Sequence, residues 1–190
     1  MEESKLAVCV DLPKPLLDWC SEFDAHLRNL GCSKVLGATY KPHITLNAGF
    51  ELSAKADIDA LLKRQLKDRT FFVKARGLAV LCLPEPLIHL RAEFDIDMQP
   101  IRDSLKQFIR IPDERLHRFN DDIWAPSATL AWIDTQYARL NDYVGGPLAQ
   151  DTRLWGSYQC TTLSIVEYQY RKQETLVGSI RLIEKSSPDN

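Results

Sequence analysis

The sequence contains two heptapeptides, Tyr40 to Leu46 and Trp124 to Leu130, that align without a gap. An aromatic residue, a proline, a threonine and a leucine recur in register, and the two copies lie about half of the 190-residue chain apart. A repeat at this separation predicts two related lobes rather than a solenoid. We therefore expect one domain, residues 1–190, of two pseudo-symmetric lobes, with residues 186–190 as a frayed tail.

The apolar periodicity predicts strands and helices that do not strictly alternate. Helices are expected at Pro13–Leu30, Ser53–Leu66 and Met98–Ile109, and a loop at Pro112–Asp122. Strands are expected at Leu6–Leu12, from Pro42, at Leu87–Phe94 and Ile123–Ile133, and in a closing hairpin of Thr161–Tyr170 with Thr175–Ile183. Thr70–Leu83 is expected as one long strand or a pair of strands. This order, with hairpin-linked strands, favours an α+β fold over a doubly wound parallel sheet.

Composition excludes several classes of protein. Hydrophobic residues make up 45% of the chain and charged residues 26%, which is typical of a globular domain. Apolar runs fall short of the roughly 20 residues of a membrane-spanning helix, and the N-terminus lacks a signal peptide pattern. A net charge of −2 provides no overall positive field that would attract long duplex nucleic acid. A small anionic ligand is still possible, because a few local cations are enough to bind it.

The five cysteines are an odd number without C-x-x-C spacing, which is typical of reduced thiols in the cytoplasm. We therefore expect a cytoplasmic, monomeric protein with no membrane partner. No metal and no cofactor are expected.

The repeat carries polar residues at alternating positions. Because side chains i and i+2 of a strand share a face, His43 projects with Thr45, and Ser127 projects with Thr129. If the two strands lie side by side, these four side chains converge on one groove. The intervening residues then face the core; they are Ile44, Leu46, Ala128 and Leu130.

Such a groove suits phosphodiester transfer. One imidazole takes a proton from the attacking hydroxyl or water, a second gives a proton to the leaving oxygen, and two threonine hydroxyls hold non-bridging oxygens. Histidine fits both roles because its ordinary pKa of about 6.5 lies near neutrality. The two motifs supply one imidazole, that of His43.

These residues resemble the signature of the two-histidine phosphoesterase superfamily, the 2'-5' RNA ligase-like family, which has two H-x-T/S motifs on related lobes. His43-Ile44-Thr45-Leu46 matches the first motif in full, and the order of expected elements is similar over essentially the whole chain. The resemblance implies a bilobal, pseudo-twofold α+β fold, in which two antiparallel sheets line a central cleft and the helices lie outside. His43 is then a catalytic acid or base, and Thr45 and Thr129 bind the substrate phosphate.

The implied activity is metal-independent acid–base catalysis on an RNA-like or cyclic nucleotide phosphodiester. The implied ligands are a 2',3'-cyclic phosphate, a 2'-5' linkage, a cyclic oligonucleotide or the phosphodiester at an RNA terminus. Hydrolysis, cyclisation and ligation all remain open as the direction of the reaction.

Ser127 departs from the family pattern because it stands at the position of the second catalytic histidine. Serine alone cannot act as an acid or base near neutral pH, but its hydroxyl can still hydrogen-bond a phosphate. Three explanations remain open: a substituted form of an active enzyme, a natural enzyme of low or altered activity, and a non-catalytic nucleotide-binding module that uses the same cleft.

Further residues are candidates for base or cleft contacts, with packing or solvation as the alternative for each. The aromatic candidates are Tyr40, Trp124 and Tyr168, and the candidates in the loop before the second motif are Arg115, His117 and Arg118. His89 lies on the opposite strand face from Ile88 and Leu90, so it faces either the cleft or solvent.

Overall fold

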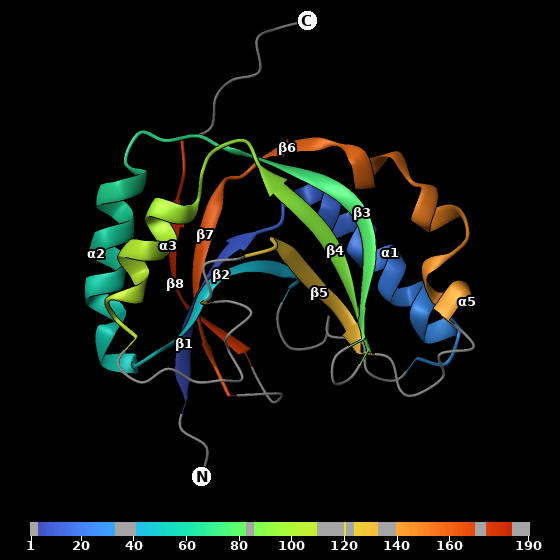
Figure 1. Cartoon of the computed structure of the whole chain (residues 1–190), viewed down its shortest axis with the longest axis horizontal. Helices are drawn as coiled ribbons and strands as arrows, with labels where there is room; N and C mark the ends of the chain where they lie inside the picture. Colours follow the sequence, from blue (N-terminus) through green and yellow to red (C-terminus); the bar gives the residue numbers. More distant parts are fainter. Residues whose placement is uncertain are drawn as a thin grey trace, which may run out of the picture.

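The computed structural model describes residues 4–32, 41–82, 86–109, 120, 124–132, 140–169 and 174–183. Within them, an 8-stranded, curled antiparallel sheet has the order β6-β3-β4-β5-β2-β1-β7-β8 (Figure 1). The strands are β1 (Lys5–Asp11), β2 (His43–Phe50), β3 (Phe72–Cys82), β4 (Pro86–Phe94), β5 (Ser127–Trp132), β6 (Ser157–Gln159), β7 (Thr162–Tyr168) and β8 (Glu174–Arg181).

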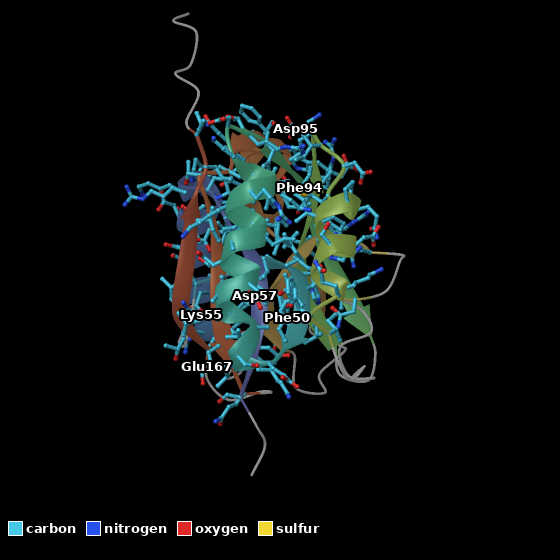
Figure 2. The ribbon with its side chains drawn as sticks, turned by 90° about the vertical axis from the view of Figure 1, so that its left-hand side faces the viewer. Phe50, Lys55, Asp57, Phe94, Asp95 and Glu167 are labelled. Atoms are coloured by element: carbon cyan, nitrogen blue, oxygen red, sulfur yellow. The ribbon has the colours of Figure 1, made fainter. Side chains whose placement is uncertain are left out.

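The helices pack on one face of this sheet. They are α1 (Lys14–Asn29), α2 (Lys55–Leu66), α3 (Gln99–Lys106) and the short α5 (Leu140–Val144), with 3-10 turns at Leu52–Ala54, Pro147–Gln150 and Thr152–Trp155. In Figure 1, α2 and α3 lie at one side of the molecule and α1 and α5 at the other. α2 contacts β8, α3 contacts β2, and α1 contacts β5. Figure 2 shows α2 between β8 and α3. Among the described helices, none is both long and apolar enough to cross a membrane.

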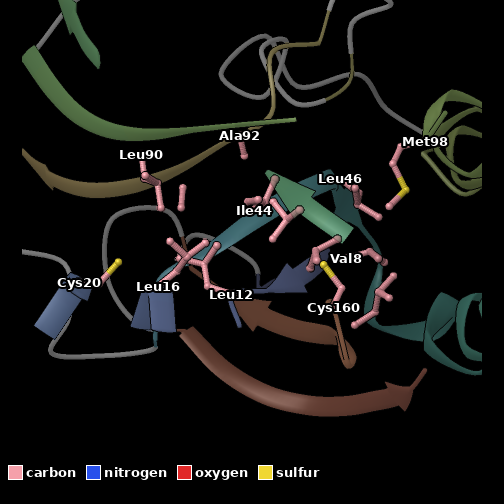
Figure 3. Close-up of a cluster of buried hydrophobic side chains, with 14 of the residues drawn as sticks. Val8, Leu12, Leu16, Cys20, Ile44, Leu46, Leu90, Ala92, Met98 and Cys160 are labelled. Atoms are coloured by element: carbon pink, nitrogen blue, oxygen red, sulfur yellow. The ribbon is translucent and has the colours of Figure 1, made fainter. Parts of the chain in front are cut away.

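One apolar core joins the helices to the sheet. Leu16 from α1, Ile44 and Leu46 from β2, and Leu90 and Ala92 from β4 belong to the same buried cluster (Figure 3). Their side chains fall at every second position of the strands, as expected for strands with one face on the core. The opposite face of β2, β4 and β5 therefore carries the alternate residues.

The expected α+β class is confirmed, with one difference in the sheet. The two expected sheets are hydrogen-bonded into one, because β5 of one half pairs with β2 of the other. The closing hairpin is present as β7 and β8. The tail 186–190 and, apart from Asn120, the expected loop Pro112–Asp122 lie outside the described residues.

Two glycines occupy left-handed backbone positions with different surroundings. Gly31 follows α1 with φ +84°, and its N–H donates to the carbonyl of Arg28, so the helix ends there as the sequence predicts. Gly77 has φ +77° at the register shift of β3 against β4, and a Cβ there would lie 3.0 Å from the Trp155 ring. No heavy atom lies within 4 Å of a Cβ placed on Gly31.

We expect Gly77→Ala to destabilise the protein more than Gly31→Ala. Both pay the penalty of about 1–2 kcal/mol for an L-residue in the left-handed region, and Gly77→Ala also displaces Trp155. Urea denaturation measures both variants. In a Trp155→Ala background the two penalties should become equal. A larger cost for Gly31→Ala would show that the contact with Trp155 does not decide the difference between the two positions.

Candidate functional site

The two repeat strands lie next to each other in the sheet. β2 pairs with β5 in antiparallel register, with Ile44 opposite Ala128, and both residues are fully buried. Pro42 and Pro126 precede these strands, where a missing N–H costs no ladder bond. The expectation that the repeat strands lie side by side with their apolar residues in the core is confirmed.

Four polar side chains flank this buried pair. Antiparallel register places His43 opposite Thr129 and Thr45 opposite Ser127, on the face away from the core. All four are half-buried. We call the sheet face that carries His43, Thr45, Ser127 and Thr129 the motif face. Directly opposed residues lie about 4.5–5.5 Å apart between Cα atoms, so one phosphate group can reach hydroxyls of both strands.

The first motif histidine is held in a defined orientation. Its Nδ1 lies 3.1 Å from the carbonyl oxygen of Lys41. A carbonyl only accepts, so Nδ1–H is the donor, and in the neutral ring the lone pair is on Nε2. His43 is therefore set up to take a proton at Nε2.

A second imidazole reaches the motif face from the neighbouring strand β4. His89 is opposite Thr129 in the β4–β5 register and is 4% exposed. Its Nδ1 lies 3.2 Å from Ser127 Oγ and 3.5 Å from Thr129 Oγ1. Of the two positions left open by the sequence, cleft or solvent, the structure has His89 against the motif hydroxyls.

Arg91 adds a positive charge to the same face. It is opposite Ser127 in the β4–β5 register and exposed, while its neighbours Leu90 and Ala92 face the core. A guanidinium binds two oxygens of a phosphate at once. Arg91 is thus a candidate phosphate ligand that the sequence pattern alone did not indicate.

A buried carboxylate stands beside the first motif. Asp11 of β1 is opposite His43 and is 7% exposed. It accepts a hydrogen bond of 2.8 Å from Ser164 Oγ and pairs with the Lys41 ammonium. Since Lys41 also accepts the His43 ring hydrogen bond through its carbonyl, this ion pair helps to fix the residue that orients His43.

Trp124 packs against neighbouring side chains. Its ring stacks on Phe94 with a centroid distance of 5.9 Å, and the Arg102 guanidinium lies 4.5 Å from its centroid. Trp124 also lines a pocket of about 260 Å³ between the end of β4, the segment that precedes β5 and the start of α3. The described contacts of Trp124 are therefore packing contacts, and the lining of this pocket includes none of the four motif-face residues.

Of the other residues that the sequence suggests as base or cleft contacts, the structure describes Tyr168. Tyr168 packs on a small apolar cluster that includes Cys9, and the Sγ of Cys9 lies 4.0 Å from Thr45 Oγ1. Tyr168 itself is opposite Lys5, at the start of β1. Tyr40, Arg115, His117 and Arg118 lie outside the described residues. Within that loop region, Asn120 is described, and its amide donates to the Ala48 carbonyl and accepts from the Ala48 N–H.

Metal-ligating residues do not gather in the described part of the chain. No group of three or more histidine, cysteine, aspartate or glutamate residues there could hold a metal ion. Burial raises the pKa of Cys20 and of Cys160 to about 12, so both thiols stay protonated at neutral pH. Burial likewise raises the pKa of the Cys9 thiol beside Thr45. The polar groups described around the motif face are thus two imidazoles, the motif hydroxyls, the Arg91 guanidinium, the Cys9 thiol and the Asp11 carboxylate with its Lys41 partner.

Comparison by fold gives several bacterial crystal structures. TT0787 of Thermus thermophilus has a TM-score of 0.66 at 16% identity, covering 94% of this chain and 97% of that one. E. coli LigT in its apo form has a TM-score of 0.58 at 16% identity, covering 96% and 99%. E. coli LigT complexed with 3'-AMP has a TM-score of 0.57 at 14% identity, covering 97% and 100%.

At these identities the likeness establishes the fold alone. It is the antiparallel α+β fold that the motif resemblance predicts for the two-histidine phosphoesterases. No protein-family model matches the sequence, and a comparison with curated proteins gives no significant match.

We expect Asp11→Ala to lower the free energy of unfolding by about 1–3 kcal/mol, because it leaves the Ser164 hydroxyl, 1% exposed, without this acceptor. Ser164→Ala in the same chain should recover part of that loss. Urea denaturation of the two single variants and the double variant gives the coupling free energy, expected at about 0.5–3 kcal/mol.

Asp18→Ala is the matched control, since Asp18 pairs with Lys14 on the surface of α1. An exposed pair of this kind contributes about 0–1 kcal/mol. Additive effects of Asp11→Ala and Ser164→Ala would show that the buried hydrogen bond contributes nothing.

Proposed function

We propose that the protein is a phosphoesterase that acts on an RNA-like or cyclic nucleotide phosphodiester by acid–base catalysis without a metal ion. The observation that carries this proposal is the pairing of β2 with β5, which brings the hydroxyls of both motifs to one face beside His43. The proposed ligand is a small nucleotide or the phosphodiester at an RNA terminus. The fold likeness to LigT complexed with 3'-AMP is compatible with a nucleotide ligand.

In this proposal His43 is the general base. Its Nε2 takes a proton from the attacking water or ribose hydroxyl as the new P–O bond forms. Thr45 and Thr129 donate hydrogen bonds to the non-bridging oxygens, where negative charge accumulates in the transition state. Arg91 is positioned to balance that charge from β4.

A second function is favoured by one specific residue. Ser127 replaces the expected second histidine, and its hydroxyl can bind phosphate without transferring a proton near neutral pH. A nucleotide-binding module would keep the threonines and Ser127 as phosphate ligands. It would show tight binding and no turnover.

The test is turnover of a panel of 2',3'-cyclic nucleotides, 2'-5' oligoadenylate and 3'-5' cyclic dinucleotides, with products separated by chromatography. His43→Ala should lower kcat by a factor of about 10²–10⁴, the range for loss of a general acid or base. His26→Ala is the control, because His26 lies on α1 beside the Asp142 carbonyl and should leave kcat unchanged.

Calorimetry with the same panel separates the two functions. Tight binding without turnover, weakened by Thr45→Val and Thr129→Val, would establish the binding module. Turnover that survives His43→Ala would refute the assignment of the base.

A further inference from the structure

The motifs contain one imidazole, but among the described residues the motif face has a second one beside it. The second is supplied by β4, one strand beyond β5, rather than by the second motif itself. Ser127 stands at the position of the second motif histidine and lies 3.2 Å from Nδ1 of His89. The residue that departs from the family pattern is thus in hydrogen-bond contact with an imidazole.

His89 and Ser127 differ in burial, and this difference decides which of the two side chains a substrate contacts. His89 is 4% exposed, whereas Ser127 is half-buried on the motif face. A substrate oxygen on that face therefore meets the serine hydroxyl first, with the ring behind it. A serine hydroxyl donates one proton and accepts another, so it can pass a proton between a substrate oxygen and the ring.

We propose that Ser127 and His89 together form the second proton-transfer group of the enzyme, with Ser127 Oγ as the relay between His89 Nδ1 and the leaving oxygen. This inference rests on the proposed phosphoesterase function. In this proposal Ser127 takes part in proton transfer, so its presence in place of histidine does not remove the second proton-transfer group.

In hydrolysis the attacking molecule is water. Water adds to phosphorus and gives one proton to His43 Nε2, while the bond from phosphorus to the leaving oxygen breaks. The leaving oxygen takes the Ser127 Oγ proton, and Oγ takes the Nδ1 proton of the His89 imidazolium, which becomes neutral. Solvent then returns a proton to His89 and removes one from His43, and no covalent bond to the protein forms.

In the described strands, the register gives His89 one neighbour on each side. Ala79 of β3 and Thr129 of β5 are opposite it in the two registers. The nearest chargeable positions by register are Arg91, two residues along β4, and His43, which is opposite Thr129 on β2. In the relay His89 must begin protonated and His43 deprotonated, so the high-pH limb of the kcat profile belongs to His89.

The test uses His89→Asn, because the asparagine amide nitrogen can lie where Nδ1 lies and keep the hydrogen bond without titrating. We expect kcat to fall by about 10²-fold or more, KM to change by less than about threefold, and the high-pH limb to disappear. Ser127→Ala should cause a similar loss, and the double variant should be no worse than either single variant.

Ser127→His provides the matched background. It places an imidazole directly in the motif, so adding His89→Asn there should change kcat by less than about threefold, against about 10²-fold in the natural sequence. Thermal melting of each variant accompanies the kinetics. If His89→Asn does not fold, Ser127→Ala together with the pH profile carries the test.

The outcomes separate the relay from the proposed function. Full activity of His89→Asn with an unchanged pH profile would overturn the relay and leave the phosphoesterase in place. So would turnover by Ser127→His with none by the natural sequence, or a phosphoryl group found on Ser127 by mass spectrometry after quenching. Absence of turnover in every variant, Ser127→His included, would overturn both.

Discussion

The pairing of β2 with β5 is the contact on which the rest of the structure depends. It joins two four-strand halves into one curled sheet, and it does so at Ile44 and Ala128, the central apolar residues of the two motifs. Burial of these two side chains forces the polar residues on either side of them to the opposite face. The same interaction therefore completes the core and assembles the candidate site.

Alternation along a strand explains how much of the site could be predicted. Spacing alone assigns His43, Thr45, Ser127 and Thr129 to one face, since a side-chain period of two is fixed by the backbone. It does not decide between cleft and solvent for His89, because that position depends on the register of β4 against β5. The register includes a shift between Ile88 and His89 that no local pattern reveals.

Short elements were the part of the fold that the sequence did not reveal. β6 has 3 residues and α5 has 5, too few positions to display a period. The strand expected from Ile123 begins at Ser127, after the segment in which Trp124 packs on Phe94 and Pro126 accepts a hydrogen bond from Ala92. In both cases tertiary contacts, rather than local preference, decide where the elements begin.

In a β-sheet, side chains of adjacent strands lie close together, so a functional group that is missing from one strand can be supplied by the next. Ser127 and His89 lie on adjacent strands with side chains in contact, so an imidazole that is absent from one strand is available from the next.

Both motifs are proposed to form a single phosphate site. A crystal structure with a bound nucleotide vanadate is the most direct test of this proposal. Vanadate oxygens should lie within about 3 Å of Thr45 Oγ1 and Thr129 Oγ1, and His43 Nε2 should contact the same vanadate group. Vanadate bound elsewhere, with the motif hydroxyls making no contact to it, would contradict the account.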